Sequence, residues 1–381
     1  MEKKHTILIT GAAGYVGAML VEQFGKRDDV EKILGIDKEP IPAELRKEAK
    51  LVYFNTNTAD DWEAEVRAHK PDLVIHTAWQ IREMYGAQDL EWQWNVGGSD
   101  KVFDYALDPE NGVDRLIYFS TVSSYGAFAT NSVDHFFKEE EGFRKSQYLY
   151  AEEKRVVEEH LEEKYGKSAH KPMVAILRPA AITGPRGRFM RIRFGLQATL
   201  AGQMKAKPAG GGSPGASQSD ALRGGHWSYS VISAMVSFVP VTPSWLRQFI
   251  HEDDVVAIVE CMAFGQKLQS GYEAFNICPP GPTVRGRDMA KAVGKKILPV
   301  YPWMVRLAFF VFWHLTRGKI PTGKGAWKGY SYPIAVDGSK LTRMTGYEYK
   351  YEGLDAFRYT DGAYESFVPV HQIRHRKTAA A

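Results

Sequence analysis

Short apolar runs alternate with helical patterns along the first two-thirds of the chain, and this alternation limits the fold more than any other feature. Each run is nearly continuous in Ile, Leu, Val and aromatic residues, which is typical of strands covered on both faces. Strands joined by helices predict an α/β fold with a Rossmann-type, doubly wound parallel sheet. We expect strands at Thr6–Thr10, Lys32–Asp37, Leu51–Phe54, Leu73–His76, Leu116–Ser120, Val174–Arg178 and Ala274–Ile277, and helices at Val16–Phe24, Asp60–His69, Val96–Ala106, Tyr150–Tyr165, Asp253–Phe264 and Val284–Val293.

A glycine-rich turn follows the first expected strand. Gly11, Gly14 and Gly17 stand at GxxGxxG spacing, which permits a tight turn and a close approach to a pyrophosphate. Asp37 ends the second expected strand, 37 − 17 = 20 residues after the last glycine, as in dinucleotide-binding units. A carboxylate there binds the adenosine ribose and repels a 2′-phosphate. We therefore predict NAD as the cofactor, with NADP the weaker alternative because Lys38 follows the acid.

Tyr150 and Lys154 stand at i and i+4, so that both side chains share one face of the expected helix. A neighbouring ammonium, together with the positive charge of an oxidised nicotinamide, favours the phenolate and lowers the pKa of the phenol. We expect Tyr150 to take a proton from a substrate hydroxyl as hydride leaves for the nicotinamide. Thr121 and Ser123 follow the fifth expected strand, where hydroxyls face the ligand crevice. These four residues form the predicted catalytic set.

These patterns also divide the chain. We place the NAD(P)-binding Rossmann domain in residues 1–184, with its sheet completed by segments from about 249–280. A smaller C-terminal substrate-binding region is expected in 185–248 and 281–373. Residues 209–225 are rich in Gly, Ser and Ala and predict a flexible loop, and 374–381 predict a frayed tail.

The order of the motifs resembles the extended short-chain dehydrogenase/reductase family, in its epimerase/dehydratase branch. Further matches are His76-Thr77-Ala78, Asn95-Val96-Gly97-Gly98-Ser99, Ser120–Gly126, Leu177-Arg178-Pro179 with Gly184-Pro185, Phe249-Ile250-His251-Glu252-Asp253-Asp254-Val255, Phe275-Asn276-Ile277 and Asp337-Gly338-Ser339-Lys340. The resemblance implies cofactor contacts at Gly11, Ala13, Gly14, Tyr15, Val16, Gly17, Asp37, Lys38, Asn57, Thr77, Ala78, Trp79, Asn95, Ser120, Tyr150, Lys154 and Pro179. It also implies that Thr121 takes the family's Ser/Thr catalytic position and that Thr121 and Arg247 contact the substrate.

Three functions stay open. The leading one is an NAD(P)-dependent oxidoreductase or epimerase that acts on a secondary alcohol of a nucleotide sugar, with Arg247 on the diphosphate. Ala181, however, stands where nucleotide-sugar members often carry asparagine, and the Arg-Pro-x-x-Ile pattern of Arg178–Ile182 resembles members that act on bulky apolar alcohols, such as 3β-hydroxysteroid or flavonoid enzymes. The third is a non-catalytic NAD-binding sensor or assembly subunit.

Residues 300–317 form an unusually aromatic segment flanked by lysine and arginine. The segment is shorter than the roughly 18–20 apolar residues that a bilayer span needs. We expect a helix that packs on the substrate-binding region or forms a dimer contact, with a lid over an apolar substrate or a peripheral membrane contact as the alternative.

Composition narrows the partners. The net charge of +4 is spread along the chain and does not predict nucleic-acid binding. Cys261 and Cys278 form no CxxC pattern, so that we expect neither a metal site nor a disulfide framework. No apolar signal segment precedes the first expected strand, which predicts a cytoplasmic protein. A small-molecule substrate and a homodimer, built on the long helices that start near Val96 and Tyr150, complete the expectations.

Overall fold

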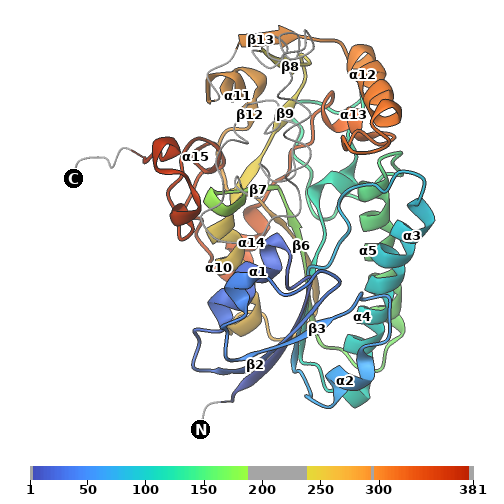
Figure 1. The fold of residues 1–381 in the computed structure, drawn as a ribbon, viewed down its shortest axis with the longest axis vertical. Coiled ribbons are helices and arrows are strands. Elements are labelled where there is room, and N and C mark those ends of the chain that lie inside the picture. Colours follow the sequence, from blue (N-terminus) through green and yellow to red (C-terminus); the bar gives the residue numbers. More distant parts are fainter. Residues whose placement is uncertain (1–2, 188–237, 293–295, 377–381) are drawn as a thin grey trace.

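A seven-stranded parallel sheet runs through the lower part of the molecule (Figure 1) in the order β11-β6-β5-β4-β1-β2-β3. The computed structural model describes residues 3–187, 238–292 and 296–376. The strands are β1 His5–Thr10, β2 Val30–Asp37, β3 Leu51–Asn55, β4 Leu73–His76, β5 Arg115–Phe119, β6 Met173–Pro179 and β11 Tyr272–Ile277. The predicted Rossmann-type fold is confirmed. The strand order reverses between β1 and β4, and in such sheets a ligand crevice forms at the C-terminal ends of these strands.

Helices cover both faces of this sheet because every strand is apolar on both sides. In β1, Ile7 and Ile9 belong to the buried cluster on one face and Leu8 to the cluster on the other, as the two-residue period of a strand requires. The first face packs against α1 Tyr15–Phe24 and α10 Glu252–Phe264. The second face lies under α2 Glu63–Arg67, α4 Gly98–Leu107 and α5 Leu149–Lys167, with α3 Gln88–Trp92 beside them (Figure 1).

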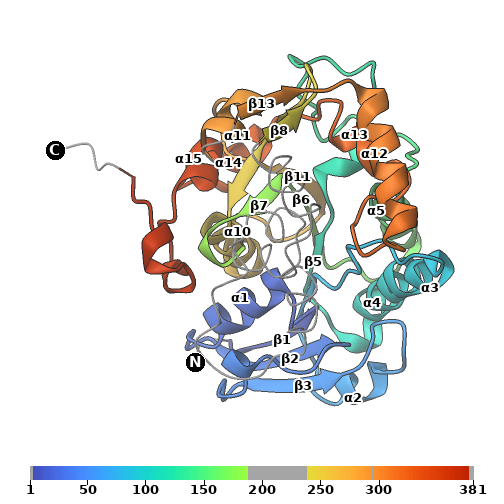
Figure 2. The same ribbon diagram turned by 45° about the horizontal axis from the view of Figure 1, so that its top comes forward.

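A smaller region stands beyond the C-terminal ends of the strands (Figure 2). It contains β8 Phe238–Val241, β9 Leu246–Arg247, β12 Val284–Arg285, β13 Lys296–Pro299, α11 Gly286–Ala292, α12 Pro302–Leu315 and α13 Ala326–Gly329. Between the two parts, β7 Ala181–Thr183 pairs in parallel with β10 Phe249–His251. After the smaller region the chain returns to the sheet. There α14 Ser339–Thr345 packs against β11, and α15 Gly353–Arg358 packs against β10. Leu341 of α14 belongs to the same buried cluster as β1.

Short helical turns join these elements. They are the 3₁₀ turns Ala43–Leu45, Pro109–Asn111, Val122–Tyr125, Glu365–Phe367 and Val370–Gln372, and the π-helical turn Gln93–Gly97 between α3 and α4. The helix expected over Asp60–His69 is shorter than predicted, because the Asn57 side chain and carbonyl bind the amides of Ala59 and Asp60 and hold a turn there.

The helix expected over Val284–Val293 is present as α11, which begins at Gly286. The first two residues of the expected range form β12 instead, because the backbone of Leu246–Arg247 offers them a strand partner. The loop predicted at 209–225 lies outside the described residues. Within the predicted tail, the backbone N–H of Arg374 donates to the Thr360 hydroxyl and that of Arg376 to the Asp361 carboxylate.

Candidate functional site

The glycine turn lies at the C-terminal end of β1, where the strand order reverses. Gly11 has a φ of +74°, and a Cβ added there would lie 2.6 Å from the backbone nitrogen of Ala78. A Cβ added at Gly17 would lie 2.1 Å from the carbonyl oxygen of Gly11. Both positions therefore require glycine. Helix α1 begins after Gly14, which provides no side-chain cap, so its first amides are open to an anion in the crevice.

The Asp37 carboxylate is joined to this turn. It accepts hydrogen bonds from the backbone N–H of Ala13, at 3.0 Å, and of Glu39, at 2.9 Å. Burial raises the pKa of Asp37, and the two hydrogen bonds oppose that rise. The predicted acid at the end of β2 thus stands against the glycine turn, as a ribose-binding carboxylate must.

The neighbours of Asp37 are engaged with protein groups. Lys38 donates to the Gln80 side chain at 2.9 Å and lies 4.2 Å above the Trp94 ring. Asn55 donates to the carbonyls of Asp37, Lys38 and Glu39, each at 3.0 Å, and so fixes the loop that carries the acid. Asn57, predicted to contact the cofactor, uses its side-chain oxygen on the Ala59 amide.

Tyr15 and Val16 belong to the first turn of α1. The Tyr15 hydroxyl donates to the buried Glu252 carboxylate, which also accepts the backbone N–H groups of Arg186 and Gly187, each at 2.8 Å. Burial raises the pKa of Glu252, and these hydrogen bonds oppose the rise. Val16 packs against the buried cluster. The contact between Tyr15 and Glu252 therefore joins the glycine turn to the start of α10.

The loop after β4 forms the other wall of the crevice. The backbone N–H and hydroxyl of Thr77 both donate to the Thr10 carbonyl, at 3.1 and 2.7 Å. Asn95, carried by the π-helical turn, accepts from the backbone N–H of Gln80 at 2.7 Å and donates to its carbonyl at 3.0 Å. Asn95 thus holds the loop of Thr77, Ala78 and Trp79.

The predicted catalytic residues gather at the C-terminal end of β5. The Lys154 ammonium donates to the Phe119 carbonyl at 2.5 Å and lies 3.4 Å above the Trp79 ring. The ring of Tyr150 meets Trp79 edge to face, with 6.4 Å between the centroids, and its hydroxyl interacts with Thr121. The structure therefore brings Thr121, Tyr150 and Lys154 together beside Trp79.

The serines of this strand end are placed differently. Ser123 donates its backbone N–H to the Thr121 hydroxyl oxygen at 3.2 Å, so Thr121 caps the 3₁₀ turn and keeps its own proton for another acceptor. Ser120 is buried, and its hydroxyl has no hydrogen-bond partner among the described residues. Trp79 likewise buries an indole N–H that is unpartnered in the described part of the chain. Such orphaned polar atoms fit a crevice that a polar ligand completes.

In the protein alone, burial raises the pKa of the Tyr150 phenol, and the interaction with Thr121 offsets the rise only in part. The predicted lowering of this pKa depends on the positive charge of a bound nicotinamide as well as on the Lys154 ammonium. Burial also lowers the pKa of Lys154 itself, against the opposing charges of Glu158 and Glu153. The ammonium is directed at Trp79 and the Phe119 carbonyl.

Glu153 is a residue that the sequence reasoning missed. Its side chain is 0% exposed, and it accepts from the Asn95 amide at 2.7 Å. Burial raises its pKa to about 8. Helical spacing could have identified it. Residues three and four positions after Tyr150 lie on the same side of an α-helix, so Glu153 shares the buried face of Lys154.

Arg247 lies on the side of the crevice toward the smaller region. Its guanidinium stands 5.1 Å from the centre of the Tyr330 ring and donates to the Gly329 carbonyl at 3.5 Å. Burial raises the pKa of the nearby Tyr148, and the charge of Arg247 opposes that rise. No carboxylate pairs with it in the described ranges. Pro179 ends β6 at the same edge of the sheet.

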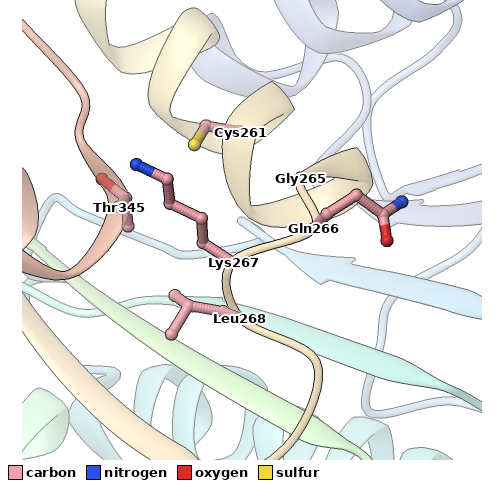
Figure 3. A pocket seen from close by; sticks show the side chains of 6 residues that line it. All are labelled: Cys261, Gly265, Gln266, Lys267, Leu268 and Thr345. Carbon is pink, nitrogen blue, oxygen red and sulfur yellow. The ribbon is translucent and has the colours of Figure 1, made fainter.

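A hollow of about 330 Å³ lies elsewhere (Figure 3), lined by Cys261, Gly265, Gln266, Lys267, Leu268 and Thr345. It stands at the end of α10, where Arg115 at the start of β5 donates to the Gly265 carbonyl. This is the N-terminal edge of the sheet, opposite the glycine turn. Burial raises the pKa of the Cys261 thiol, which disfavours the nucleophilic thiolate.

Comparisons with known proteins agree with this geometry. The sequence model of the NAD dependent epimerase/dehydratase family matches residues 7–278. L-arabinose 1-dehydrogenase (NAD(P)(+)) of Haloferax volcanii is 30% identical over 115 residues, which are 30% of this chain. The chain spans only about two fifths of the length of the curated relatives it matches, 42% and 40%.

Two solved structures share the fold over most of the chain. The Bordetella bronchiseptica enzyme WbmG in complex with NAD has a TM-score of 0.60 at 22% identity, covering 93% of this chain and 92% of that one. A UDP-glucuronic acid 4-epimerase mutant from Bacillus cereus, in complex with a UDP-sugar and NAD, has a TM-score of 0.64 at 16% identity, covering 95% and 99%. At these identities the likeness concerns the fold.

Proposed function

Because the chain belongs to the NAD dependent epimerase/dehydratase family, we propose that it is an NAD-dependent oxidoreductase or epimerase that acts on a secondary alcohol of a nucleotide sugar. The observation that carries the proposal is the meeting of Thr121, Tyr150 and Lys154 at the end of β5, across the crevice from the glycine turn. Membership in an enzyme family also agrees with the prediction of catalysis and weighs against a non-catalytic sensor.

The dinucleotide fits the residues present. The turn at Gly11 and Gly17 leaves no room for a Cβ, α1 offers uncapped amides, and Asp37 stands where a ribose diol would bind. Structural neighbours solved in complex with NAD support the same assignment. When bound, the nicotinamide supplies hydride acceptance and return.

The protein's own residues handle the proton. Tyr150 takes the proton of the substrate hydroxyl while the C–H bond of the same carbon gives up hydride, and a carbonyl results. Thr121 donates a hydrogen bond to the reacting oxygen. Lys154 stabilises the phenolate of Tyr150. Since burial raises the pKa of Tyr150, this help must come in the loaded site, where the cofactor's positive charge adds to that of the ammonium.

A nucleotide sugar is favoured by Arg247. A half-buried guanidinium without a carboxylate partner among the described residues, at the side of the crevice away from the glycine turn, suits a diphosphate. The alternative, a bulky apolar alcohol, draws support from Ala181 in place of an asparagine and from the aromatic residues around Tyr330. Homodimer formation through α4 and α5, and a cytoplasmic location, stay predictions.

The test is Tyr150→Phe. We expect turnover to fall at least 100-fold, as loss of a general acid–base does, with NAD affinity kept within a few-fold. Tyr165→Phe is the matched control, since it removes the same hydroxyl from the same helix, near the other end of α5. Substrates are a panel of UDP- and dTDP-sugars beside a panel of sterols, followed by cofactor absorbance.

The activity and binding results distinguish the catalytic assignment from the choice of substrate. Turnover that survives in Tyr150→Phe refutes the catalytic assignment. If Arg247→Ala abolishes UDP binding, the nucleotide-sugar proposal stands. If only sterols are oxidised and UDP binds neither protein, the apolar-alcohol alternative replaces it.

A further inference from the structure

Helix α12 exposes a continuous apolar ridge. We define this ridge as Trp303, Met304, Leu307, Phe310 and Val311, which recur at the three- and four-residue spacing of one helix face. Trp303, Leu307 and Phe310 are 64%, 55% and 63% exposed. Side chains of this size are normally buried, and a contiguous exposed apolar face marks an interaction surface.

The opposite face of α12 is already covered. Phe309 packs against Tyr330 with 5.2 Å between ring centroids, and Trp313 packs against Tyr85 at 5.4 Å. Helix α12 therefore sits firmly on α13 and the loop of Tyr85, at the outer edge of the smaller region (Figure 2). The inner face of α12 therefore packs on the smaller region, as predicted. The ridge on the outer face stays exposed.

The charged residues of α12 and of the segments that flank it in the sequence are all basic. Between Asp288 and Asp337 the sequence contains eight lysines and arginines and not one aspartate or glutamate: Lys291, Lys295, Lys296, Arg306, Arg317, Lys319, Lys324 and Lys328. Lys296, Arg306, Arg317 and Lys319 are exposed, and within the described residues none of the four forms an ion pair with a carboxylate. A helix with exposed Trp and Leu, lying among unpaired cations, has the composition of an interfacial helix that binds an anionic lipid surface.

We propose that the ridge docks this protein on an anionic membrane surface, with α12 lying in the plane of the headgroups. No helix in the described ranges has the length and apolar character to cross a bilayer, so the contact is peripheral. A second copy of the chain fits the ridge less well, because a symmetric contact would bring the cations of one α12 region against those of the other.

Docking has a consequence for the site. Tyr330 packs against Phe309 on the inner face of α12 and also lies under the Arg247 guanidinium. One ring therefore separates the membrane helix from the arginine at the crevice. The substrate-binding side of the molecule is thereby set close to the lipid surface.

The test is co-sedimentation of the full chain with vesicles of phosphatidylcholine, with and without phosphatidylserine. We expect binding to the anionic vesicles, weakened by salt because the charge contribution is screened. The triple variant Trp303→Gln/Leu307→Gln/Phe310→Gln should lose at least tenfold in partitioning, and Arg317→Gln/Lys319→Gln should lose the preference for anionic lipid. The control Phe136→Gln/Val370→Gln, which removes exposed apolar side chains elsewhere, should bind as the parent does.

Light scattering measures the oligomeric state of each variant, and circular dichroism measures its fold and melting temperature. All substituted side chains in the triple variant are exposed, so the fold and melting temperature should be unchanged. Absence of vesicle binding by the parent, or equal binding by the parent and the triple variant, overturns the proposal. So does a parent dimer that the triple variant turns into monomers, since the ridge would then be covered by a second copy.

Discussion

Replacing Glu153 by glutamine tests the electrostatics behind Lys154 most directly. The side chain is fully buried; one carboxylate oxygen accepts from Asn95, and the other has no hydrogen-bond partner in the described part of the chain. Burial raises the pKa from its usual value near 4.5 to about 8, and the charge of Glu91 adds to the rise. Glutamine keeps the shape and the acceptor for Asn95 but removes the charge.

Proton linkage determines how the stability of the protein changes with pH. Between about pH 4.5 and pH 8 the folded state holds a proton on Glu153 that the unfolded state has lost, so the free energy of unfolding falls as pH rises through this window. At about 1.4 kcal/mol per pKa unit, the full shift sets an upper bound of about 5 kcal/mol. Glu91, with a pKa of about 7, shares this titration, so we expect roughly 2 kcal/mol between about pH 5 and pH 8.5.

Urea unfolding across this pH range measures the difference. We expect Glu153→Gln to equal the parent within about 1 kcal/mol at low pH and to gain on it steadily as the pH rises. Glu162→Gln, an exposed change on the same helix, should run parallel to the parent at all pH values. Parallel curves for Glu153→Gln and the parent would show that the carboxylate is charged in the folded protein, and the reasoning would fail.

Three further changes follow from the same geometry. Gly17→Ala, whose methyl carbon meets the Gly11 carbonyl at 2.1 Å, should cost about 1–3 kcal/mol in urea unfolding and weaken NAD binding in a fluorescence titration; an unaffected affinity contradicts the glycine-turn site. Arg178→Met leaves the Glu158 carboxylate buried without its partner and should cost about 3–5 kcal/mol, which Glu158→Gln in the same chain should partly restore. Asp37→Ala should lower the preference for NAD over NADP at least tenfold by competition binding, and an unchanged preference removes Asp37 from the ribose site.

Local pattern was sufficient for the sheet and for the order of its motifs. Strands covered on both faces are short and apolar throughout, so β1 to β6 could be located without knowledge of their partners. The glycines of the turn and Asp37 were found for a similar reason, since their roles depend on backbone geometry and spacing along a few residues. The family match over residues 7–278 confirms that reading.

Properties that depend on neighbours distant in sequence could not be read from the pattern. Val284 and Arg285 form a strand because β9, nearly forty residues earlier, lies beside them. The pKa of Tyr150 is raised because the fold buries the phenol. The Lys154 ammonium meets the Phe119 carbonyl, a contact between residues 35 positions apart. Which face of α12 is covered depends on where Tyr85 and Tyr330 come to rest. Burial and desolvation are set by all the atoms around a group, and those atoms meet only when the chain has folded.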